Sequence, residues 1–262
     1  MIWQDLQRIR AESPLILNIT NYVVMNTTAN ALLATGASPV MAHAIEEMVE
    51  MTAHAKVLVI NIGTLSGPWI ASMLEAGREA RRRGIAIVLD PVGCGATRFR
   101  THTAQTLIDE IHPTIIRGNA SEIKALIRAG AGGRGVDSLH TPDEAGEDAR
   151  ALARAAHCVV TVSGAVDLIV DGEREARVAN GDPLMSRVTG MGCTASALTG
   201  AFAAVNASAF DAATRAMTLM GVAGEIAAER AAGPGSFQMH FLDVLHGIGE
   251  ADFAQRVKPQ AH

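Results

Sequence analysis

The sequence predicts an α/β fold in which helices cover both faces of a mainly parallel central sheet. Short runs rich in β-branched residues alternate with longer Ala- and Leu-rich stretches of helical period, which is the pattern of repeated βα units. Hydrophobic residues make up 48% of the chain and aromatic residues only 3%, so aliphatic side chains must fill the core between helices and sheet. We expect residues 1–262 to form a single domain, because α/β proteins of this length commonly do.

The strands and helices are expected in alternation from the N-terminus. The β-branched runs predict strands at residues 15–19, 39–41, 57–62, 85–89, 114–116, 159–162 and 168–171. The stretches of helical period predict helices at residues 26–34, 46–53, 68–83, 103–111, 121–129 and 142–155. From Thr194 onward almost the whole chain is expected to be helical. Strands joined by helices in this way pair in parallel.

Particular residue types predict where one helix starts and where one loop lies. Thr141 and Pro142 are typical of a helix start, because Thr caps, Pro takes the first helical position and Glu144 can complete a capping box. The stretch 129–139 (AGAGGRGVDSL) is too rich in glycine for a helix or strand, so we expect a mobile surface loop.

A β-hairpin is expected after the last of the parallel strands. The runs 166–170 and 173–178 are separated by Asp171-Gly172, a dipeptide that favours tight hairpin turns. The sheet should therefore gain an antiparallel edge.

Charge and composition exclude several classes of function. The 22 basic residues are outnumbered by 27 acidic ones, and no basic stripe with interleaved aromatics occurs, so nucleic acid is not an expected partner. No apolar run reaches the roughly 20 residues that cross a bilayer, so no membrane association is expected. Cys94, Cys158 and Cys193 lack metal-ligand spacing and no signal peptide is apparent, which favours a reduced, cytoplasmic protein.

The strongest chemical signal is the segment 188–196 (VTGMGCTAS), where two glycines lead into an Ala-rich helix. Gly190 and Gly192 let backbone N–H groups converge, and the helix start adds the positive end of its dipole. Such an arrangement stabilises an anion, as phosphoryl transfer to an alcohol requires. A simple turn before a helix would also explain the two glycines taken alone.

Several separated motifs, in order, resemble the hydroxyethylthiazole kinase family of the ribokinase-like superfamily. The superfamily carries Gly-x-Gly-Asp at the start of a late helix, and this family has Cys at the Asp position. The resembling blocks are NITNYVV at 18–24, NIGTL at 61–65, DPVGCG at 90–95, RGNASEI at 117–123 and GMGC at 190–193.

The resemblance implies a fold and a reaction. The fold would be ribokinase-like, with three layers, and the reaction would be ATP-dependent phosphorylation of the hydroxyl of 4-methyl-5-(2-hydroxyethyl)thiazole in thiamine biosynthesis or salvage. Mg²⁺ would be the cofactor. A homotrimer with active sites at the subunit interfaces is also implied.

By the same resemblance, Cys193 is the general base that takes the proton of the substrate hydroxyl, and the Gly190 to Gly192 backbone assists. A free thiol has a pKa of about 8.5, and a helix N-terminus lowers it, so a useful thiolate fraction is expected. A buried structural cysteine is the alternative, and it is the interpretation favoured for Cys94 and Cys158.

Two carboxylates are candidates for binding Mg²⁺. Glu122 belongs to an Asn-x-x-Glu motif that begins at Asn119, and Asp90 follows a buried strand, where ligand sites of α/β proteins lie. Mg²⁺ keeps several waters and needs few protein ligands, so two carboxylates suffice. Capping a helix or a turn is the alternative role for each.

The remaining candidates bind the two substrates. The resemblance places Arg117 and Ser163 in contact with ATP, and Met41, Asn21 and the Gly190 backbone around the thiazole. A guanidinium would neutralise phosphate charge, and a thioether is suited to a sulfur heterocycle. A surface ion pair, a turn serine and a core methionine are the alternatives for Arg117, Ser163 and Met41.

Four other functions fit the sequence less well. A sister kinase for hydroxymethylpyrimidine or pyridoxal is disfavoured by residues 18–24, and a nucleotide-dependent hydratase-repair lyase by Cys193 in place of Asp. A cysteine hydrolase would need Cys193 with His157 or His240, but no oxyanion motif accompanies them. A non-catalytic nucleotide sensor is disfavoured because Glu122, Arg117 and Cys193 occur together.

Overall fold

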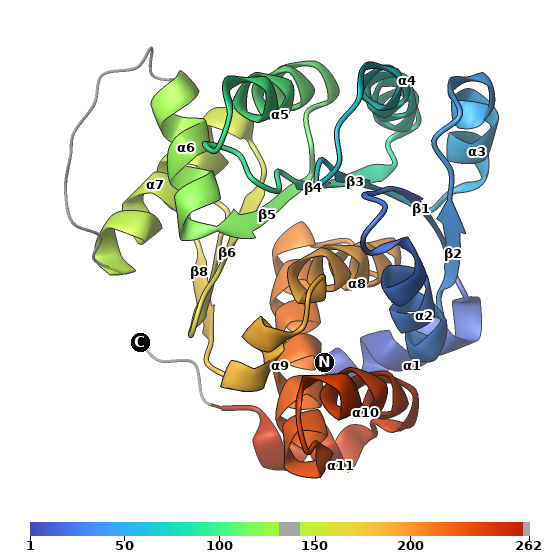
Figure 1. Ribbon diagram of the computed structural model, residues 1–262, viewed down its shortest axis with the longest axis vertical. Helices are drawn as coiled ribbons and strands as arrows, with labels where there is room; N and C mark the ends of the chain where they lie inside the picture. Colours follow the sequence, from blue (N-terminus) through green and yellow to red (C-terminus); the bar gives the residue numbers. More distant parts are fainter. Residues whose placement is uncertain (131–141, 259–262) are drawn as a thin grey trace.

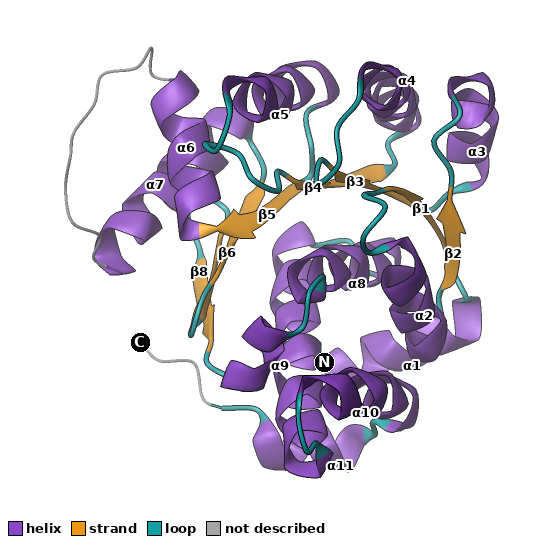
Figure 2. Ribbon diagram, viewed as in Figure 1, coloured by secondary structure: helices purple, strands orange, loops and turns teal. Residues whose placement is uncertain are grey.

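The computed structural model describes residues 1–130 and 142–258, and its central feature is an eight-stranded sheet in the order β2-β1-β3-β4-β5-β6-β7-β8 (Figures 1 and 2). Strands β1 to β6 pair in parallel, whereas β7 and β8 are antiparallel. The strands are β1 (Leu15–Ile19), β2 (Ser38–Met41), β3 (Val57–Asn61), β4 (Ala86–Asp90), β5 (Ile115–Asn119), β6 (Val159–Ser163), β7 (Asp167–Val170) and β8 (Glu175–Val178). The predicted antiparallel edge is confirmed.

Helices cover both faces of the sheet, which confirms the predicted fold class (Figure 2). One face carries the short 3-10 helix η1 (Ile45–Glu47), α3 (Met48–His54), α4 (Gly67–Arg83), α5 (Arg98–Ile111), α6 (Ala120–Gly130) and α7 (Pro142–Ala156). The other carries α1 (Ile2–Glu12), α2 (Met25–Thr35), the 3-10 helix η2 (Pro183–Arg187), α8 (Met191–Val205) and α9 (Ala209–Arg230), with α10 (Pro234–Gly247) and α11 (Glu250–Arg256) beyond them.

The core consists of two apolar layers separated by the sheet. In β3, Val57 and Val59 pack toward α8, and Leu58 and Ile60 pack toward the helices on the opposite face. Both sets are buried, which explains why β3 is apolar without interruption from Val57 to Ile60 rather than alternating.

One described helix was not predicted, and three element boundaries differ from the predictions by three residues or more. Helix α1 was not predicted, although Ile2, Leu6 and Ile9 have helical spacing. Helix α5 begins at Arg98 instead of residue 103, because Thr97 accepts a hydrogen bond from the Arg100 backbone N–H and caps it. Strand β5 continues to Asn119 instead of ending at residue 116, and α8 begins at Met191 instead of residue 194.

The glycine-rich segment is only partly described. Helix α6 continues through Gly130, so the first two residues of the predicted loop 129–139 are helical. The rest of that loop lies outside the described residues. Helix α7 begins at Pro142 as predicted, but its expected cap by Thr141 and Glu144 lies outside the described side chains.

The strand order determines where a ligand can bind. The chain passes from β1 to β2 on one side and then to β3 on the other, so the strand order reverses between β1 and β3. Ligands of open α/β sheets bind at the carboxyl ends of the strands beside such a reversal. Among the described helices, none has both the length and the apolar character that crossing a bilayer requires.

Candidate active site

Polar side chains gather at the carboxyl ends of β1, β3 and β4. Asn61 and Asp90 are the last residues of β3 and β4, and Asn21 follows β1. Cys193 lies in the first turn of α8, which packs against these strands. The predicted residues Asn21, Asp90 and Cys193 are therefore brought to the point at which the strand order reverses.

A chain of hydrogen bonds connects these residues through Asn61. Asn21 Nδ2 donates to Asn61 Oδ1 at 2.8 Å and to Cys193 Sγ at 3.5 Å, and Asn61 Nδ2 donates to Asp90 Oδ2 at 2.9 Å. Asn61 is 1% exposed, so its amide is committed to this network. Asn61 was not singled out from the sequence, although a buried strand that ends in a polar residue is a signal that could have identified it.

Ser196 is a second residue that was missed. It lies one helical turn after Gly192 in α8, and its Oγ donates to Asp90 Oδ2 at 2.7 Å. Burial raises the pKa of Asp90 to about 6, against the opposing effects of the Arg117 charge and the hydrogen bonds from Ser196 and Asn61. The carboxylate is therefore kept in place by α8 as well as by its own strand.

The thiol of Cys193 is not activated in the way that the helix start suggested. Burial and then the Asp90 carboxylate raise the pKa of Cys193 to about 11, although hydrogen bonds from Asn61 and Asn21 and the charge of Arg117 lower it. The expectation of a lowered pKa was wrong, because it considered only the local helix end and neither the burial nor the carboxylate from β4. The resting thiol is neutral at physiological pH.

The two glycines of the motif allow close approaches that other residues would block. Gly190 is the N-cap of α8 with φ +84°, and a Cβ there would lie 2.6 Å from Val24 Cγ1. A Cβ on Gly192 would lie 3.1 Å from a guanidinium nitrogen of Arg117. Gly192 was expected in the turn before the helix, but it lies in the first turn of α8 itself. Arg117 therefore contacts the start of the helix.

Arg117 is a buried cation with an unsatisfied donor. Its side chain comes from within β5, it is 7% exposed, and its Nε has no hydrogen-bond partner among the described residues. Arg117, Ser163 and Gly192 line a cavity of about 600 Å³ between the sheet and α8 and α9. A buried donor without a partner is unfavourable unless a ligand accepts its hydrogen bond, so the part of this cavity beside Arg117 suits an anion.

Ser163 and Met41 are placed by their strands. Ser163 ends β6 and its Oγ donates to the Gly118 carbonyl at 3.3 Å beside Arg117. Met41 ends β2, half-buried, with Asn18 of β1 as its register partner, and takes no part in the hydrogen-bond network. The structure therefore brings Ser163 to the cavity with Arg117, whereas Met41 lies at the edge strand.

An aromatic group lies near these strand ends. The Tyr22 and His43 rings lie 4.8 and 4.5 Å from the Trp69 ring, measured between centroids. Trp69 is buried, but Tyr22 is 66% exposed and the adjacent Val23 is 62% exposed. This exposed apolar surface directly follows Asn21.

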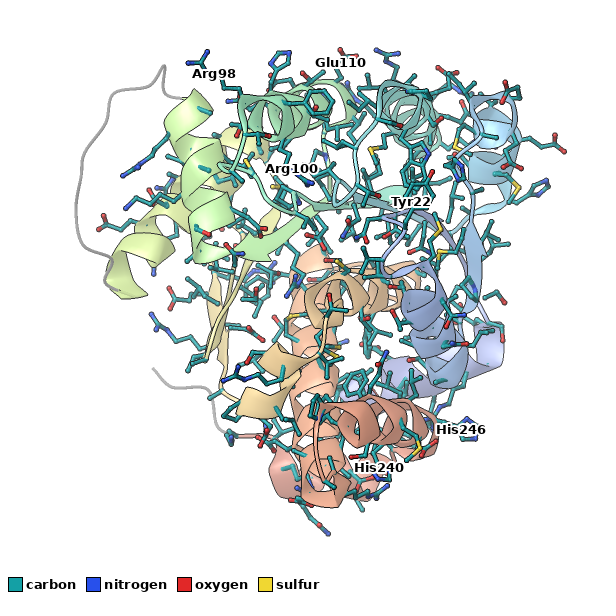
Figure 3. The ribbon with its side chains drawn as sticks, in the orientation of Figure 1. Tyr22, Arg98, Arg100, Glu110, His240 and His246 are labelled. Atoms are coloured by element: carbon teal, nitrogen blue, oxygen red, sulfur yellow. The ribbon has the colours of Figure 1, made fainter. Side chains whose placement is uncertain are left out.

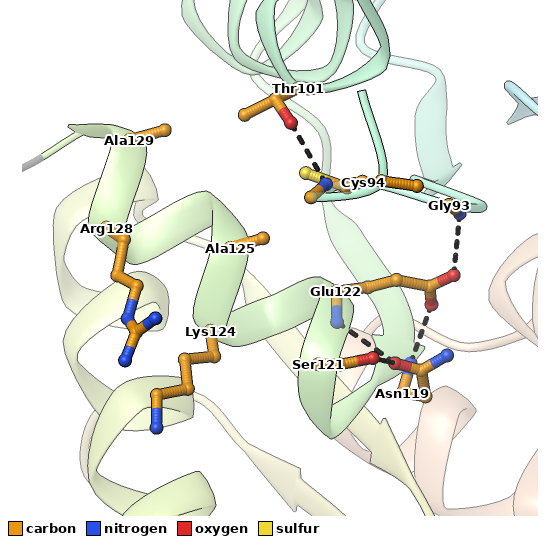
Figure 4. A pocket seen from close by; sticks show the side chains of 12 residues that line it. Gly93, Cys94, Thr101, Asn119, Ser121, Glu122, Lys124, Ala125, Arg128 and Ala129 are labelled. Carbon is orange, nitrogen blue, oxygen red and sulfur yellow. Dashed lines mark hydrogen bonds between the residues drawn. The ribbon is translucent and has the colours of Figure 1, made fainter. Parts of the chain in front are cut away.

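Glu122 lies in a different cavity, of about 770 Å³ (Figure 4). Its Oε2 accepts from the Asn119 N–H at 2.8 Å, and Asn119 Oδ1 accepts from the Glu122 N–H at 3.0 Å, so the pair forms a capping box for α6. Its Oε1 accepts from the Gly93 N–H at 2.8 Å, in the loop that follows Asp90. Glu122 thus caps a helix and also ties that helix to the Asp90 loop.

Asp90 and Glu122 suit Mg²⁺ only if most of the other ligands of the ion are not protein side chains. The described residues contain no group of three or more His, Cys, Asp or Glu side chains that could hold a metal ion. Asp90 Oδ1 accepts none of the hydrogen bonds in the network, so it is available to a cation or to a cation-bound water. The donor set therefore fits Mg²⁺ that is bound chiefly by nucleotide phosphates and water.

Neither histidine of the hydrolase alternative belongs to this network. The Cys193 thiol contacts the side chains of Asn21 and Asn61. His240 lies on α10, where its Nδ1 is 3.8 Å from Asp243, and His157 lies between α7 and β6. The arrangement for nucleophilic catalysis is not formed.

Comparison with known proteins gives consistent matches over the whole chain. The model of the hydroxyethylthiazole kinase family matches residues 6–251. A hydroxyethylthiazole kinase from Nitratidesulfovibrio vulgaris is 55% identical over 98% of this chain and 96% of its own. The solved structure of the Pyrococcus horikoshii hydroxyethylthiazole kinase protein is 45% identical, with a TM-score of 0.93, over 100% of this chain and 99% of its own.

More distant structures share the fold alone. The ADP complex of Bacillus subtilis pyridoxal kinase aligns with a TM-score of 0.58 at 18% identity, over 79% of this chain and 89% of its own. The same three-layer arrangement of sheet and helices therefore occurs in kinases with another acceptor.

Proposed function

The chain belongs to the hydroxyethylthiazole kinase family, and we propose that the Asn21–Asn61–Cys193 network and the cavity beside Arg117 are its acceptor and nucleotide sites. The protein is a kinase that transfers a phosphoryl group from ATP to the hydroxyl of 4-methyl-5-(2-hydroxyethyl)thiazole. The buried guanidinium of Arg117, whose Nε has no hydrogen-bond partner among the described residues, lies beside the start of α8 and is the observation that carries the assignment of the nucleotide site.

The nucleotide phosphates bind between Arg117 and α8. The guanidinium neutralises phosphate charge, and the N–H groups of the first turn of α8, exposed by the Gly190 cap, stabilise the charge on the transferred group. Ser163 offers a hydroxyl in the same cavity. The burial of the guanidinium, which is 7% exposed, strengthens its electrostatic interaction with the phosphates.

Cys193 accepts the proton of the substrate hydroxyl. As the hydroxyl oxygen forms a bond to the γ-phosphorus and the bond to ADP breaks, the proton moves to Sγ. The amides of Asn21 and Asn61 donate to that sulfur and thereby stabilise its charged form. Because the resting thiol is neutral, the reactive thiolate is the minor form of the free protein.

Asp90 and Glu122 are the residues that would hold Mg²⁺. Both lie at the carboxyl edge of the sheet, and the Gly93 N–H connects their loops. When bound, the ion would neutralise phosphate charge together with the Asp90 carboxylate charge that raises the thiol pKa.

Asn21, Met41 and the Gly190 backbone line the acceptor pocket, and a second subunit completes it in a homotrimer. The exposed Tyr22 and Val23 beside Asn21 support this arrangement, because they present apolar surface at the edge of the pocket. Light scattering at three times the chain mass of 27.4 kDa is the direct check. One domain for residues 1–262, a cytoplasmic location and a role in thiamine salvage complete the proposal.

Substitution of Cys193 tests the catalytic assignment. Cys193→Ser should lower turnover by about 10²- to 10⁴-fold, since a serine hydroxyl is far too weak a base. Cys193→Asp should retain much more activity, because a carboxylate is ionised at neutral pH. ATP affinity should change little in both variants, because Arg117 and the backbone of α8 make the nucleotide contacts.

Cys158→Ser is the matched control. Cys158 is buried in the apolar layer on the other face of the sheet, and burial raises its pKa to about 12. This variant should keep the turnover of the parent protein. Equal turnover for Cys193→Ser and the parent at saturating substrates would show that the thiol is not the base.

A further inference from the structure

Arg100 joins the two loops that follow the catalytic strands. It lies in the first turn of α5 (Figure 3), and its guanidinium contacts the loops that follow β3 and β4. Its Nη1 donates to the carbonyls of Ile62 and Val92, both at 2.8 Å, and its Nη2 donates to the Gly63 carbonyl at 2.7 Å. Ile62 directly follows Asn61, and Val92 lies two residues after Asp90.

The side-chain stem of Arg100 also supports the turn that contacts Glu122. Gly93 has φ +74°, and a Cβ there would lie 3.2 Å from Arg100 Cδ. The Gly93 N–H donates to Glu122 Oε1 (Figure 4). Arg100 therefore packs against Gly93, whose backbone N–H connects the Asp90 loop to the Glu122 carboxylate.

The Asp90 loop needs such support because of its composition. Gly93 and Gly95 both have positive φ, and glycine loses more conformational freedom on ordering than any other residue. The start of α5 is independently fixed, since Thr97 caps it and Thr101 Oγ1 accepts from the Gly95 N–H at 2.9 Å. The capped start of α5 thus presents a planar donor to the two loops.

We propose that Arg100 is a positioning residue that sets the distance between Asp90 and Glu122 by fixing the loops at residues 62–63 and 91–95. The hydrogen bonds that the structure gives to its guanidinium all go to carbonyl oxygens, which is the arrangement of a clamp rather than of an ion pair. The inference rests on the proposed role of these two carboxylates in holding Mg²⁺. Lysine cannot replace this residue fully, because an ammonium lacks the planar fork that reaches three carbonyls.

Arg100→Gln and Arg100→Lys test the clamp, with Arg98→Gln as the matched control. Arg98 opens the same helix, is exposed and carries the same charge (Figure 3). Hydrogen–deuterium exchange of the protein without substrates measures the loops directly. Exchange across residues 91–97 and 62–65 should quicken by about tenfold or more in Arg100→Gln, since charge-assisted hydrogen bonds are lost. The start of α8 and the Arg98→Gln variant should match the parent protein.

A magnesium titration of turnover provides the second readout. Arg100→Gln should need several times more Mg²⁺ for half-maximal turnover, with an unchanged KM for the thiazole alcohol, and Arg100→Lys should fall between this variant and the parent. Parent-like exchange and magnesium dependence in Arg100→Gln would overturn the proposal. So would faster exchange throughout the protein, because that result indicates a purely structural role. If the parent protein itself showed no magnesium-dependent transfer, the proposed function would fail while the exchange data still tested the clamp.

Discussion

The burial of the Arg117 guanidinium and of the Cys193 thiol costs free energy in the protein without substrates. Arg117 buries a charge whose Nε has no hydrogen-bond partner among the described residues, and Cys193 buries a thiol close to the Asp90 carboxylate. The Arg117 charge is partly compensated by Asp90, whose pKa it lowers, but the unsatisfied Nε donor and the burial of the thiol each cost free energy. Phosphate bound in the cavity would pair with the Arg117 guanidinium. The substrate proton would neutralise the Cys193 thiolate.

Replacing Arg117 with Met should separate stability from binding. Arg117→Met removes a buried donor without a partner but also the charge that favours ionised Asp90, so these opposing effects should leave the free energy of unfolding without ligand within about 1 kcal/mol of the parent. ATP affinity should fall at least about tenfold, because one charge-assisted contact is lost. Denaturant unfolding and calorimetric titration with ATP measure the two effects. A less stable variant with unchanged ATP affinity would contradict this role for Arg117.

The raised thiol pKa predicts how the rate depends on pH. With the pKa of Cys193 at about 11, the thiolate fraction increases roughly tenfold for each pH unit below that value. The single-turnover rate of phosphate transfer should therefore rise steadily between about pH 7 and pH 9. Cys193→Asp should be flat over this range, since its carboxylate is already ionised. A flat profile for the parent protein would mean that proton acceptance by the thiol does not limit transfer.

The sequence predicted which residues meet at the site better than it predicted the protonation state of the Cys193 thiol. Asn21, Asp90 and Cys193 were expected at one site, and the structure brings them together. The thiol pKa was wrong because burial and Asp90 act from other parts of the chain. Asn61, Ser196 and Arg100 were missed because their roles depend on partners 29 residues, 106 residues and 38 residues away in sequence.

Among the elements, the start of α6 combines capping with a proposed cation site. Both Glu122 oxygens accept backbone N–H groups, one from Asn119 and one from Gly93. The two interpretations of Glu122 from the sequence, a helix cap and a magnesium ligand, are therefore compatible. Each oxygen retains a second lone pair for a water or a cation.

Glu122→Gln tests both roles in one variant. The amide keeps one oxygen but turns an NH₂ toward a backbone N–H, so the free energy of unfolding should fall by about 1–3 kcal/mol. Turnover should also fall, and the Mg²⁺ concentration for half-maximal turnover should rise. Thermal unfolding and a magnesium titration measure the two effects separately. Lost stability with unchanged magnesium dependence would leave Glu122 as a cap only.

Element types could be predicted more reliably than element boundaries. The β-branched runs identified seven of the described strands, because a buried strand of this kind of sheet needs a largely apolar segment. The eighth, β8, was found only through the Asp171-Gly172 turn of the predicted hairpin. The start of α8 was placed late because Gly190-Met191-Gly192 has weak helix propensity, and packing against the sheet overrides that propensity. The extension of β5 through Arg117 and Gly118 was missed because an arginine is unexpected inside a buried strand.

For the whole molecule, the strand order explains why one edge of the sheet collects the chemistry. The reversal between β1 and β3 places Asn21 and Asn61 side by side, and α8 packs against both strands. The sequence predicted alternating strands and helices but could not give this order, because the order depends on which strands pair across distant segments. The motif blocks at residues 18–24, 61–65, 90–95 and 190–193 meet only in the folded chain.

The acceptor preference of the purified protein is the sharpest test of its assignment as a kinase for the thiazole alcohol. The measurement is ADP release with ATP and Mg²⁺ against three alcohols: 4-methyl-5-(2-hydroxyethyl)thiazole, hydroxymethylpyrimidine and pyridoxal. The thiazole alcohol should have the highest kcat/KM, with a phosphorylated thiazole as the product. A higher kcat/KM for pyridoxal or hydroxymethylpyrimidine would contradict the account, because the site would then belong to a sister kinase on the same fold.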